Sequence, residues 1–227
     1  MEQQTVARAE SERGEVVVRR RADGALELRV NGVFVMDTAQ TSSERLLARA
    51  VLADSGLADS GLADDGPDRL LVGGLGLGFT VRELLADPRV RQVVVAELEP
   101  AVVSWMSDGT LPGADLLADP RVEVRITDVR DAVAASADAS YAGVLLDVDN
   151  GPGYLVHDAN VAVYREDFLR DCRRVIRDGG RLTVWSAAPA PELVATLSQV
   201  FGSVTSLPVD VDLQGRAEQY WLLSAVR

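Results

Sequence analysis

The stretch Gly73-Gly74-Leu75-Gly76-Leu77-Gly78 decides the fold, because a strand-like run precedes it and a helical run follows it. The first run is Arg69-Leu70-Leu71-Val72 and the second is Phe79-Thr80-Val81-Arg82-Glu83-Leu84. Glycines let the backbone turn tightly and approach a ligand, and the following helix offers free N–H groups. The context therefore predicts a ligand site at Gly73, Gly74, Gly76 and Gly78. No Gly-Lys-Ser/Thr follows, which excludes phosphoryl transfer on the Walker A plan.

Strand-like and helical runs alternate on the C-terminal side of this stretch. The predicted strands are 69–73, 92–97, 122–126, 143–147 and 181–185, and the predicted helices lie near 77–86, 100–107, 129–136, 161–177 and 191–200. Gly179-Gly180 is expected to end the fourth helix, and 217–225 to form a last strand that pairs with 203–207. The alternation predicts a doubly wound α/β protein, with a mostly parallel sheet covered on both faces.

Acidic residues follow three of the predicted strands. Glu97 ends the second strand about 20 residues beyond the glycines, where an acid bonds the hydroxyl groups of a ribose. Asp128 follows the third strand and is expected to accept a bond from an adenine amino group, so the pattern indicates a nucleoside. Glu99 is interpreted as an exposed acid that caps the next helix.

The fourth strand runs into Asp147-Val148-Asp149-Asn150-Gly151-Pro152-Gly153-Tyr154. Asp147 is the predicted base or cation holder, because ligands bind at the carboxyl edge of such sheets. Asp149 and Asn150 have the alternative interpretation of turn residues. His157, in the loop that follows, is a candidate proton shuttle. Cys172 and the tryptophans are interpreted first as packing residues.

The N-terminal part, 1–53, has a different pattern. Runs at 15–20, 25–30 and 33–36 predict a small three-stranded β-meander with an Asn31-Gly32 turn. Thr41-Ser42-Ser43-Glu44 predicts a capped helix after it. Residues 54–66 continue a Leu-Ala-Asp-Ser-Gly repeat that begins at Leu52, and composition favours an acidic linker. The nucleoside-binding domain is then predicted over 67–227.

Composition excludes several classes of function. The 227 residues carry 23 basic and 35 acidic side chains, for a net charge of −12, which argues against nucleic-acid and membrane-surface partners. One cysteine and one histidine exclude multi-cysteine zinc sites and His-rich metal sites, so no metal is expected. No apolar run is long enough to span a bilayer, and the polar start does not look like a signal peptide. The expected location is cytoplasmic.

The sequence resembles the spermidine synthase (polyamine aminopropyltransferase) family at four places. They are the glycine run, Glu97-Leu98-Glu99-Pro100-Ala101-Val102-Val103, Asp119-Pro120-Arg121-Val122-Glu123-Val124, and Asp128. The resemblance covers roughly 25–190. It implies a class I methyltransferase-like Rossmann fold behind a small β-domain. It also implies that Glu97 holds the ribose, Asp128 the adenine, and that Asp147 deprotonates the attacking amine. Met36-Asp37-Thr38-Ala39-Gln40 is similar to another family motif, and Gln40 matches its glutamine.

The sequence departs from the family at the positions that hold a polyamine. The family has an acid in the glycine loop where this chain has Leu75 or Gly76-Leu77. The family's second aspartate aligns with Asn150 or Asp149. A Tyr-His-Glu element is replaced by Ser42-Ser43-Glu44, so only Glu44 is kept. Glu44, Asp149, Asn150, Tyr154 and His157 are therefore the candidate acceptor-binding residues.

The resulting hypothesis is a transferase that uses S-adenosylmethionine or its decarboxylated form. Methyl transfer and aminopropyl transfer to a small-molecule acceptor both stay open, with Asp147 and Gln40 as catalytic candidates. The missing acid in the glycine loop favours a ligand that keeps its carboxylate, which is a slight argument for methyl transfer. The alternative is a non-catalytic nucleoside-binding or scaffold protein. The sequence also allows a homodimer.

Overall fold

The computed structural model describes residues 4–53 and 68–227. The repeat interpreted as a linker, 54–66, lies outside the described residues. No described helix is long and apolar enough to cross a lipid bilayer.

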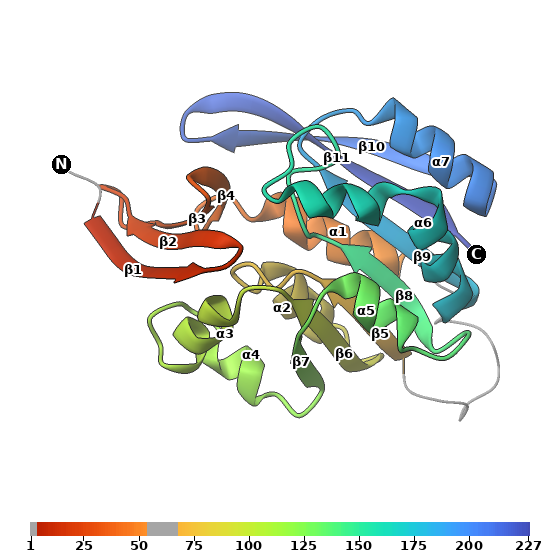
Figure 1. Cartoon of the computed structure of the whole chain (residues 1–227), viewed down its shortest axis with the longest axis horizontal. Coiled ribbons are helices and arrows are strands. Elements are labelled where there is room, and N and C mark those ends of the chain that lie inside the picture. The colour runs from red at the N-terminus through yellow and green to blue at the C-terminus, as the bar shows by residue number, and fades with distance from the viewer. Residues whose placement is uncertain (1–3, 54–67) are drawn as a thin grey trace.

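A sheet of seven strands, in the order β10-β11-β9-β8-β5-β6-β7, forms the body of the molecule (Figure 1). The parallel strands are β5 (Asp68–Gly73), β6 (Val90–Glu97), β7 (Val122–Ile126), β8 (Tyr141–Leu146) and β9 (Ile176–Ser186). The last two, β10 (Val204–Leu213) and β11 (Arg216–Val226), form an antiparallel hairpin at one edge. The chain leaves β5 on one side for β6 and returns to its other side for β8. The carboxyl ends of β5 and β8 thus form the switch point where ligands bind in such sheets.

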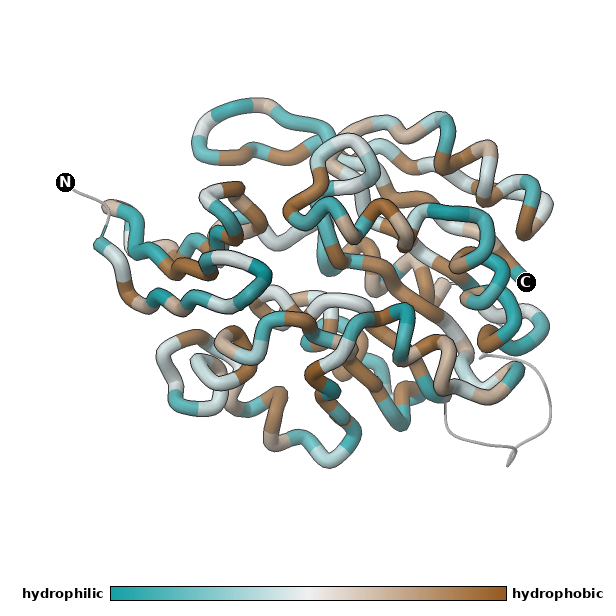
Figure 2. Tube along the Cα trace, in the orientation of Figure 1, coloured by the Kyte–Doolittle hydropathy of each residue, from teal (hydrophilic) through white to brown (hydrophobic). Residues whose placement is uncertain are grey.

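Helices cover both faces of this sheet, which confirms the doubly wound α/β prediction. They are α1 (Ser42–Leu52), α2 (Phe79–Leu85), α3 (Pro100–Ser107), α4 (Ala114–Ala118), α5 (Val129–Ala134), the 3-10 helix η1 (Asp158–Tyr164), α6 (Glu166–Val175) and α7 (Pro191–Phe201). Neighbouring residues of one strand pack into different cores: Leu70 lies with Leu47 of α1, whereas Leu71 lies with Leu169 of α6. This alternation explains the continuous apolar runs of the central strands, which Figure 2 shows in brown.

The N-terminal part is a second, antiparallel sheet in the order β1-β2-β3-β4. Its strands are β1 (Gln4–Ser11), β2 (Gly14–Arg20), β3 (Leu26–Val30) and β4 (Val33–Asp37). The predicted meander lacked β1, because that strand is mostly exposed and its apolar positions are few. Val18 and Leu28 of this sheet belong to the same core as Leu47 and Leu70. The small sheet therefore shares a core with one face of the large sheet.

Two further predictions on helices were wrong. The run 161–177 is not one helix: η1 and α6 divide it, and α6 ends at Val175. Gly179-Gly180 then lies inside β9, because Ile176 already pairs with Tyr141 of β8 in extended backbone. A Cβ atom on Gly180 would lie 2.6 Å from the Ala142 carbonyl oxygen, so close packing between strands explains this glycine. The short helix α4 was not predicted.

Candidate nucleoside and acceptor site

A pocket at the carboxyl ends of β5, β6, β7 and β8 brings most of the predicted site residues together. Its lining includes Gly74, Gly76, Glu97, Asp128, Asp147, Glu44, Asp149, Asn150 and His157. The N-terminal sheet closes the pocket from the opposite side with Leu28, Val30, Val35 and Met36. Gly73, Gly78, Gln40 and Tyr154 do not line it. Residues of the N-terminal sheet and of the large sheet thus surround one cavity.

The glycine loop joins two strand ends at the switch point. Asp147 N–H donates to the Gly73 carbonyl at 2.9 Å, and Gly74 N–H donates to the Ala96 carbonyl at 2.8 Å. Gly74 has a φ of +90°, and a Cβ atom there would lie 2.1 Å from the Asp147 carbonyl oxygen. Only glycine fits at this position without moving the backbone. The loop therefore holds the carboxyl end of β8 against that of β5.

Glu97 is fixed by two backbone donors. Its Oε2 accepts from Leu75 N–H and its Oε1 from Glu99 N–H, each at 2.7 Å. The side chain is 7% exposed, and this burial raises the pKa of Glu97 even though the hydrogen bonds act in the opposite direction. Because both carboxylate oxygens are held from the protein side, the group has one orientation at the pocket wall, and its remaining lone pairs can accept bonds from a ligand.

Asp128 is also held in place, here by an arginine and a helix end. It accepts from Arg130 N–H at the N-terminus of α5, and the Arg130 guanidinium lies 2.6 Å from Asp128 Oδ2. Partial burial acts to raise the pKa of Asp128, but the bonds from Arg130 outweigh it and the pKa is lowered. Asp128 is therefore a charged, oriented acceptor at the rim.

Glu44 and Asp147, here called the carboxylate pair, differ from Glu97 and Asp128 in their hydrogen-bond partners. Thr80 Oγ1 donates to Asp147 Oδ2 at 3.0 Å and lies 3.5 Å from the Glu44 carbonyl oxygen, so it links α1 to the end of β8. Among the described residues, no basic side chain forms an ion pair with either carboxylate. Burial first, and then the nearby Asp147, raises the pKa of Glu44 to about 7. Burial raises the pKa of Asp147 to about 6.

The helix α1 starts where the sequence predicts, but the expected capping hydrogen bonds are absent and Glu44 lines the pocket instead. Thr41 occupies the N-cap position but its side chain makes no capping bond. Glu44 does not return to the backbone of Thr41 as a capping box requires. Instead its Oε2 accepts from the Ser43 hydroxyl at 2.8 Å, and the residue is only 7% exposed.

The polar residues after β8 have structural contacts. Asp149 Oδ1 accepts from Val156 N–H at 2.6 Å and its Oδ2 from Asn160 Nδ2 at 2.9 Å, while Asn150 Nδ2 donates to the Phe34 carbonyl at 3.0 Å. These bonds shape the loop and tie it to β4. Tyr154 is 62% exposed on the same loop.

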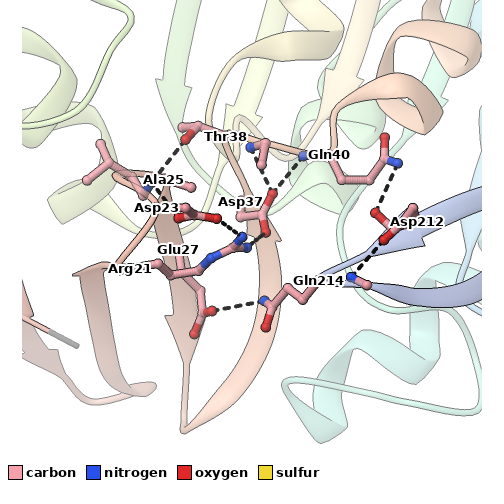
Figure 3. A network of polar contacts seen from close by, with 12 residues as sticks. Arg21, Asp23, Ala25, Glu27, Asp37, Thr38, Gln40, Asp212 and Gln214 are labelled. Atoms are coloured by element: carbon pink, nitrogen blue, oxygen red, sulfur yellow. Dashed lines mark hydrogen bonds and ion pairs between the residues drawn. The ribbon is translucent and has the colours of Figure 1, made fainter. Parts of the chain in front are cut away.

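Gln40 lies outside the pocket and contacts the hairpin at the edge of the large sheet (Figure 3). Its Nε2 donates to the Asp212 carbonyl at 3.4 Å, and its Oε1 accepts from Ser42 N–H at 3.0 Å. Nearby, Gln214 Nε2 donates to Glu27 at 3.3 Å. Gln40 therefore connects the start of α1 to the β10–β11 hairpin.

Glu99 is not the exposed helix cap that was expected. It stands at the N-cap position of α3 without a side-chain capping bond, and it is 6% exposed. Arg13, from the β1–β2 turn, lies 3.3 Å from Glu99 Oε1, and His157 Nε2 lies 3.8 Å from the same atom. The ion pair between Arg13 and Glu99 thus connects the N-terminal hairpin to the rim of the pocket.

Three residues of the site were missed by the sequence reasoning. Arg13 and Thr80 act through partners that are 86 and 67 positions away, which no local pattern reveals. Trp185 lies next to the last residue of β9 and was interpreted as a packing residue. It does pack, with its ring centroid 4.7 Å from that of Tyr220, but it also lines the pocket.

The strand order, the glycine loop and the carboxyl-end pocket define a class I methyltransferase-type α/β protein. The human methyltransferase-like protein 13, in complex with SAH, superposes with a TM-score of 0.59 at 19% identity, over 80% of this chain and 79% of that one. A spermidine synthase in complex with the transition-state analogue AdoDATO superposes with a TM-score of 0.79 at 15% identity, over 98% of this chain and 73% of that one. These likenesses establish the fold.

Sequence comparison indicates which proteins of this fold class the chain is similar to. The polyamine aminopropyltransferase of Nitrosomonas europaea is 33% identical over 159 residues, which are 66% of this chain and 46% of that protein. No protein-family model matches the chain. The chain spans about half the length of the curated relatives it matches. Its sequence is thus similar to that of the polyamine aminopropyltransferases, whereas the structural likeness to spermidine synthases is one of fold.

Proposed function

We propose that this chain is a transferase that moves an aminopropyl group from decarboxylated S-adenosylmethionine to a small amine. The carboxylate pair carries the proposal: Glu44 is buried, Asp147 is half-buried, and neither has a basic partner among the described residues. Both line the pocket that also contains Glu97 and Asp128. Two desolvated carboxylates in one pocket favour an incoming cation, because it relieves their mutual repulsion. An amine supplies that cation. The relationship to aminopropyltransferases supports the same reaction.

The nucleoside half of the pocket consists of Gly74, Gly76, Glu97 and Asp128. We assign the ribose hydroxyls to Glu97, because its carboxylate is buried, oriented and placed at a strand end beside the glycine loop. The adenine amino group is assigned to Asp128, an acceptor at the next strand end. The ligands of two structural neighbours, AdoDATO and SAH, are both adenosyl compounds, which supports this division. No group of three or more metal-binding side chains occurs among the described residues. The proposed reaction does not require a metal ion.

The acceptor half consists of Glu44, Asp147 and Trp185. Here Asp147 orients the amine and takes its proton. The amine nitrogen forms a bond to the propyl carbon, the bond between that carbon and the sulfonium sulfur breaks, and methylthioadenosine leaves. A raised pKa suits Asp147 to this role, because a base works best when its pKa is close to the working pH. Gln40 contributes indirectly, since it holds Ser42 at the start of α1 and so places Glu44.

Methyl transfer from S-adenosylmethionine is a second candidate, supported by the apolar glycine loop. Leu75 and Leu77 are 4% and 3% exposed, and neither offers an acid to an aminopropyl ammonium. A donor that keeps its carboxylate avoids the need for such an acid. The two candidates differ in the donor and share the acceptor half.

Mass spectrometry of the products distinguishes them. The protein is incubated with S-adenosylmethionine or its decarboxylated form and a set of amines, and both the modified amine and the released thioether are measured. Formation of methylthioadenosine together with an aminopropylated amine, from the decarboxylated donor, is the expected result. If the protein is instead a methyltransferase, the products are a methylated amine and S-adenosylhomocysteine. Binding of both nucleosides without any product would favour the non-catalytic scaffold.

A further inference from the structure

The acids around the pocket differ in whether they are already neutralised. Glu97 is bonded to two backbone N–H groups and Asp128 to Arg130. Asp149 is bonded to Val156 N–H and Asn160, and Glu99 lies against Arg13. Within the described residues that line the pocket, this leaves Glu44 and Asp147 as the acids with neither a cation nor a backbone donor from another segment. Both acids are therefore available to a cation that enters the pocket.

The acids just beyond the pocket are occupied as well (Figure 3). Asp37 follows Met36 of the pocket wall, is 1% exposed, and is bound by Arg21 and by the backbone N–H groups of Ala39 and Gln40. Glu27, also 1% exposed, is bound by Arg29. A second ammonium on this side of the pocket would therefore lie near the positively charged guanidinium of Arg21, and Asp37 and Glu27 would not be available to bind it.

The small sheet and β9 contribute an apolar part of the wall. Leu28, Val30, Val35 and Met36 face the pocket from the small sheet. Trp185, 7% exposed, lines it from β9, and its indole N–H has no hydrogen-bond partner in the described part of the chain. An ammonium group is only a donor and cannot satisfy that N–H. The aromatic face and the aliphatic side chains instead favour a hydrocarbon body.

We propose that the acceptor is a singly charged primary amine with an apolar body, and not a diamine or polyamine. Its ammonium lies between Glu44 and Asp147, and its body lies against Trp185 and the aliphatic wall. A second ammonium in this pocket would lose its water without gaining a carboxylate, which is costly. The inference rests on the proposed function, because it assumes that the carboxylate pair is the acceptor site.

Calorimetry of matched amines tests the inference without depending on turnover. The full chain is first saturated with methylthioadenosine, and then hexylamine, 1,6-diaminohexane and hexan-1-ol are titrated separately. We expect hexylamine to bind at least about tenfold more tightly than the diamine and than the alcohol, a ratio equal to about 1.4 kcal/mol. Equal or tighter binding of the diamine, or no binding of hexylamine, would overturn the inference.

Two tryptophan-to-alanine variants distinguish the loss of a pocket contact from a general loss of packing. Trp185→Ala should weaken hexylamine binding about tenfold or more, because it removes the aromatic wall. Trp221→Ala, on the neighbouring strand β11 and outside the pocket lining, should leave it within about twofold, as expected for a residue that makes no contact. Circular dichroism checks that both fold, and Trp185→Phe, which keeps an aromatic ring, provides a milder variant. Equal losses from Trp185→Ala and Trp221→Ala would contradict the assigned wall.

The failure of the inference and that of the proposed function remain distinguishable. If no transfer occurs from either sulfonium donor but hexylamine still binds more tightly than the diamine, the reaction is wrong and the cation site stands. If transfer occurs with diamines alone, the reaction stands and the inference falls.

Discussion

The two halves of the pocket treat their carboxylates in opposite ways. In the nucleoside half, Glu97 and Asp128 are bonded to backbone N–H groups or to an arginine before any ligand arrives. In the acceptor half, Glu44 and Asp147 accept side-chain hydrogen bonds from the hydroxyl groups of Ser43 and Thr80, and no cation pairs with either among the described residues. The first arrangement is preorganised for a neutral, hydroxyl-rich ligand. The second is electrostatically unfavourable until a cation binds, so the difference separates recognition of the nucleoside from recognition of the acceptor.

The largest expected effect follows from neutralising one member of the carboxylate pair. Asp147→Asn keeps the size of the side chain and can still interact with Thr80, but it cannot take up the proton of the amine. We expect turnover to fall by about 10²–10⁴-fold, the usual contribution of a general base, while nucleoside affinity is retained. Steady-state kinetics and calorimetry with methylthioadenosine measure the two quantities.

Asp171→Asn is the matched control for Asp147→Asn. Asp171 lies on α6, with 55% of its side chain exposed, away from the pocket lining. Its turnover should equal that of the unchanged protein. If Asp147→Asn keeps full turnover with every accepted amine, Asp147 is not the base, and the comparison between the halves loses its catalytic meaning.

The next effect concerns stability, and its sign follows from the direction of the pKa shift. The folded-state pKa of Glu44 is about 7, above its ordinary value of 4.5, so folding favours the protonated form. The stability from this group is present below pH 4.5 and is lost as pH rises through 7. A shift of this size corresponds to at most about 3 kcal/mol of unfolding free energy. Glu44→Gln should therefore be more stable than the unchanged protein at pH 8, by up to that amount, and equal to it in acid.

Glu83→Gln provides a control of opposite sign. Glu83 is bound by Arg45 and Arg49, and these bonds lower its pKa. Its contribution is present above the pKa of the unfolded chain and is lost as pH falls, so Glu83→Gln should be less stable at pH 8. Urea unfolding at several pH values measures both variants. Destabilisation of Glu44→Gln at pH 8 would show that the carboxylate of Glu44 is compensated in the folded protein.

The nucleoside half could be predicted from the sequence far better than the acceptor half. A glycine loop after a strand, and acids at the next strand ends, are local signals whose positions in space follow from parallel strand order. That reasoning brought Gly74, Glu97, Asp128 and Asp147 into one pocket. The acceptor half depends on contacts between distant segments, such as those of Thr80 with Asp147 and of Trp185 with Tyr220.

The same contrast explains the errors in the fold. Gly179-Gly180 resembles a helix end when its neighbours alone are considered, but the pairing of Ile176 with Tyr141 had already ended the helix. A tertiary contact, which the local sequence does not encode, determined the structure there. The position of the Gln40 side chain, which contacts Asp212 of the distant hairpin, likewise depends on a contact that its motif does not reveal.

The smallest of the expected effects concerns the nucleoside half. Glu97→Ala removes the acceptor for the ribose hydroxyls, and it also leaves Leu75 N–H and Glu99 N–H without their partner. Loss of such bonds typically costs about 1–3 kcal/mol, so the affinity for methylthioadenosine should fall by about 5–150-fold. Glu123→Ala, on the adjacent strand β7 and paired with Arg125, is the control and should bind normally. Because the unpaired N–H groups also weaken the folded state, calorimetry is carried out only where circular dichroism shows a folded variant. Unchanged affinity in folded Glu97→Ala would mean that the oriented carboxylate of Glu97 does no more than hold the glycine loop, and the ribose would then have to lie elsewhere along the strand ends.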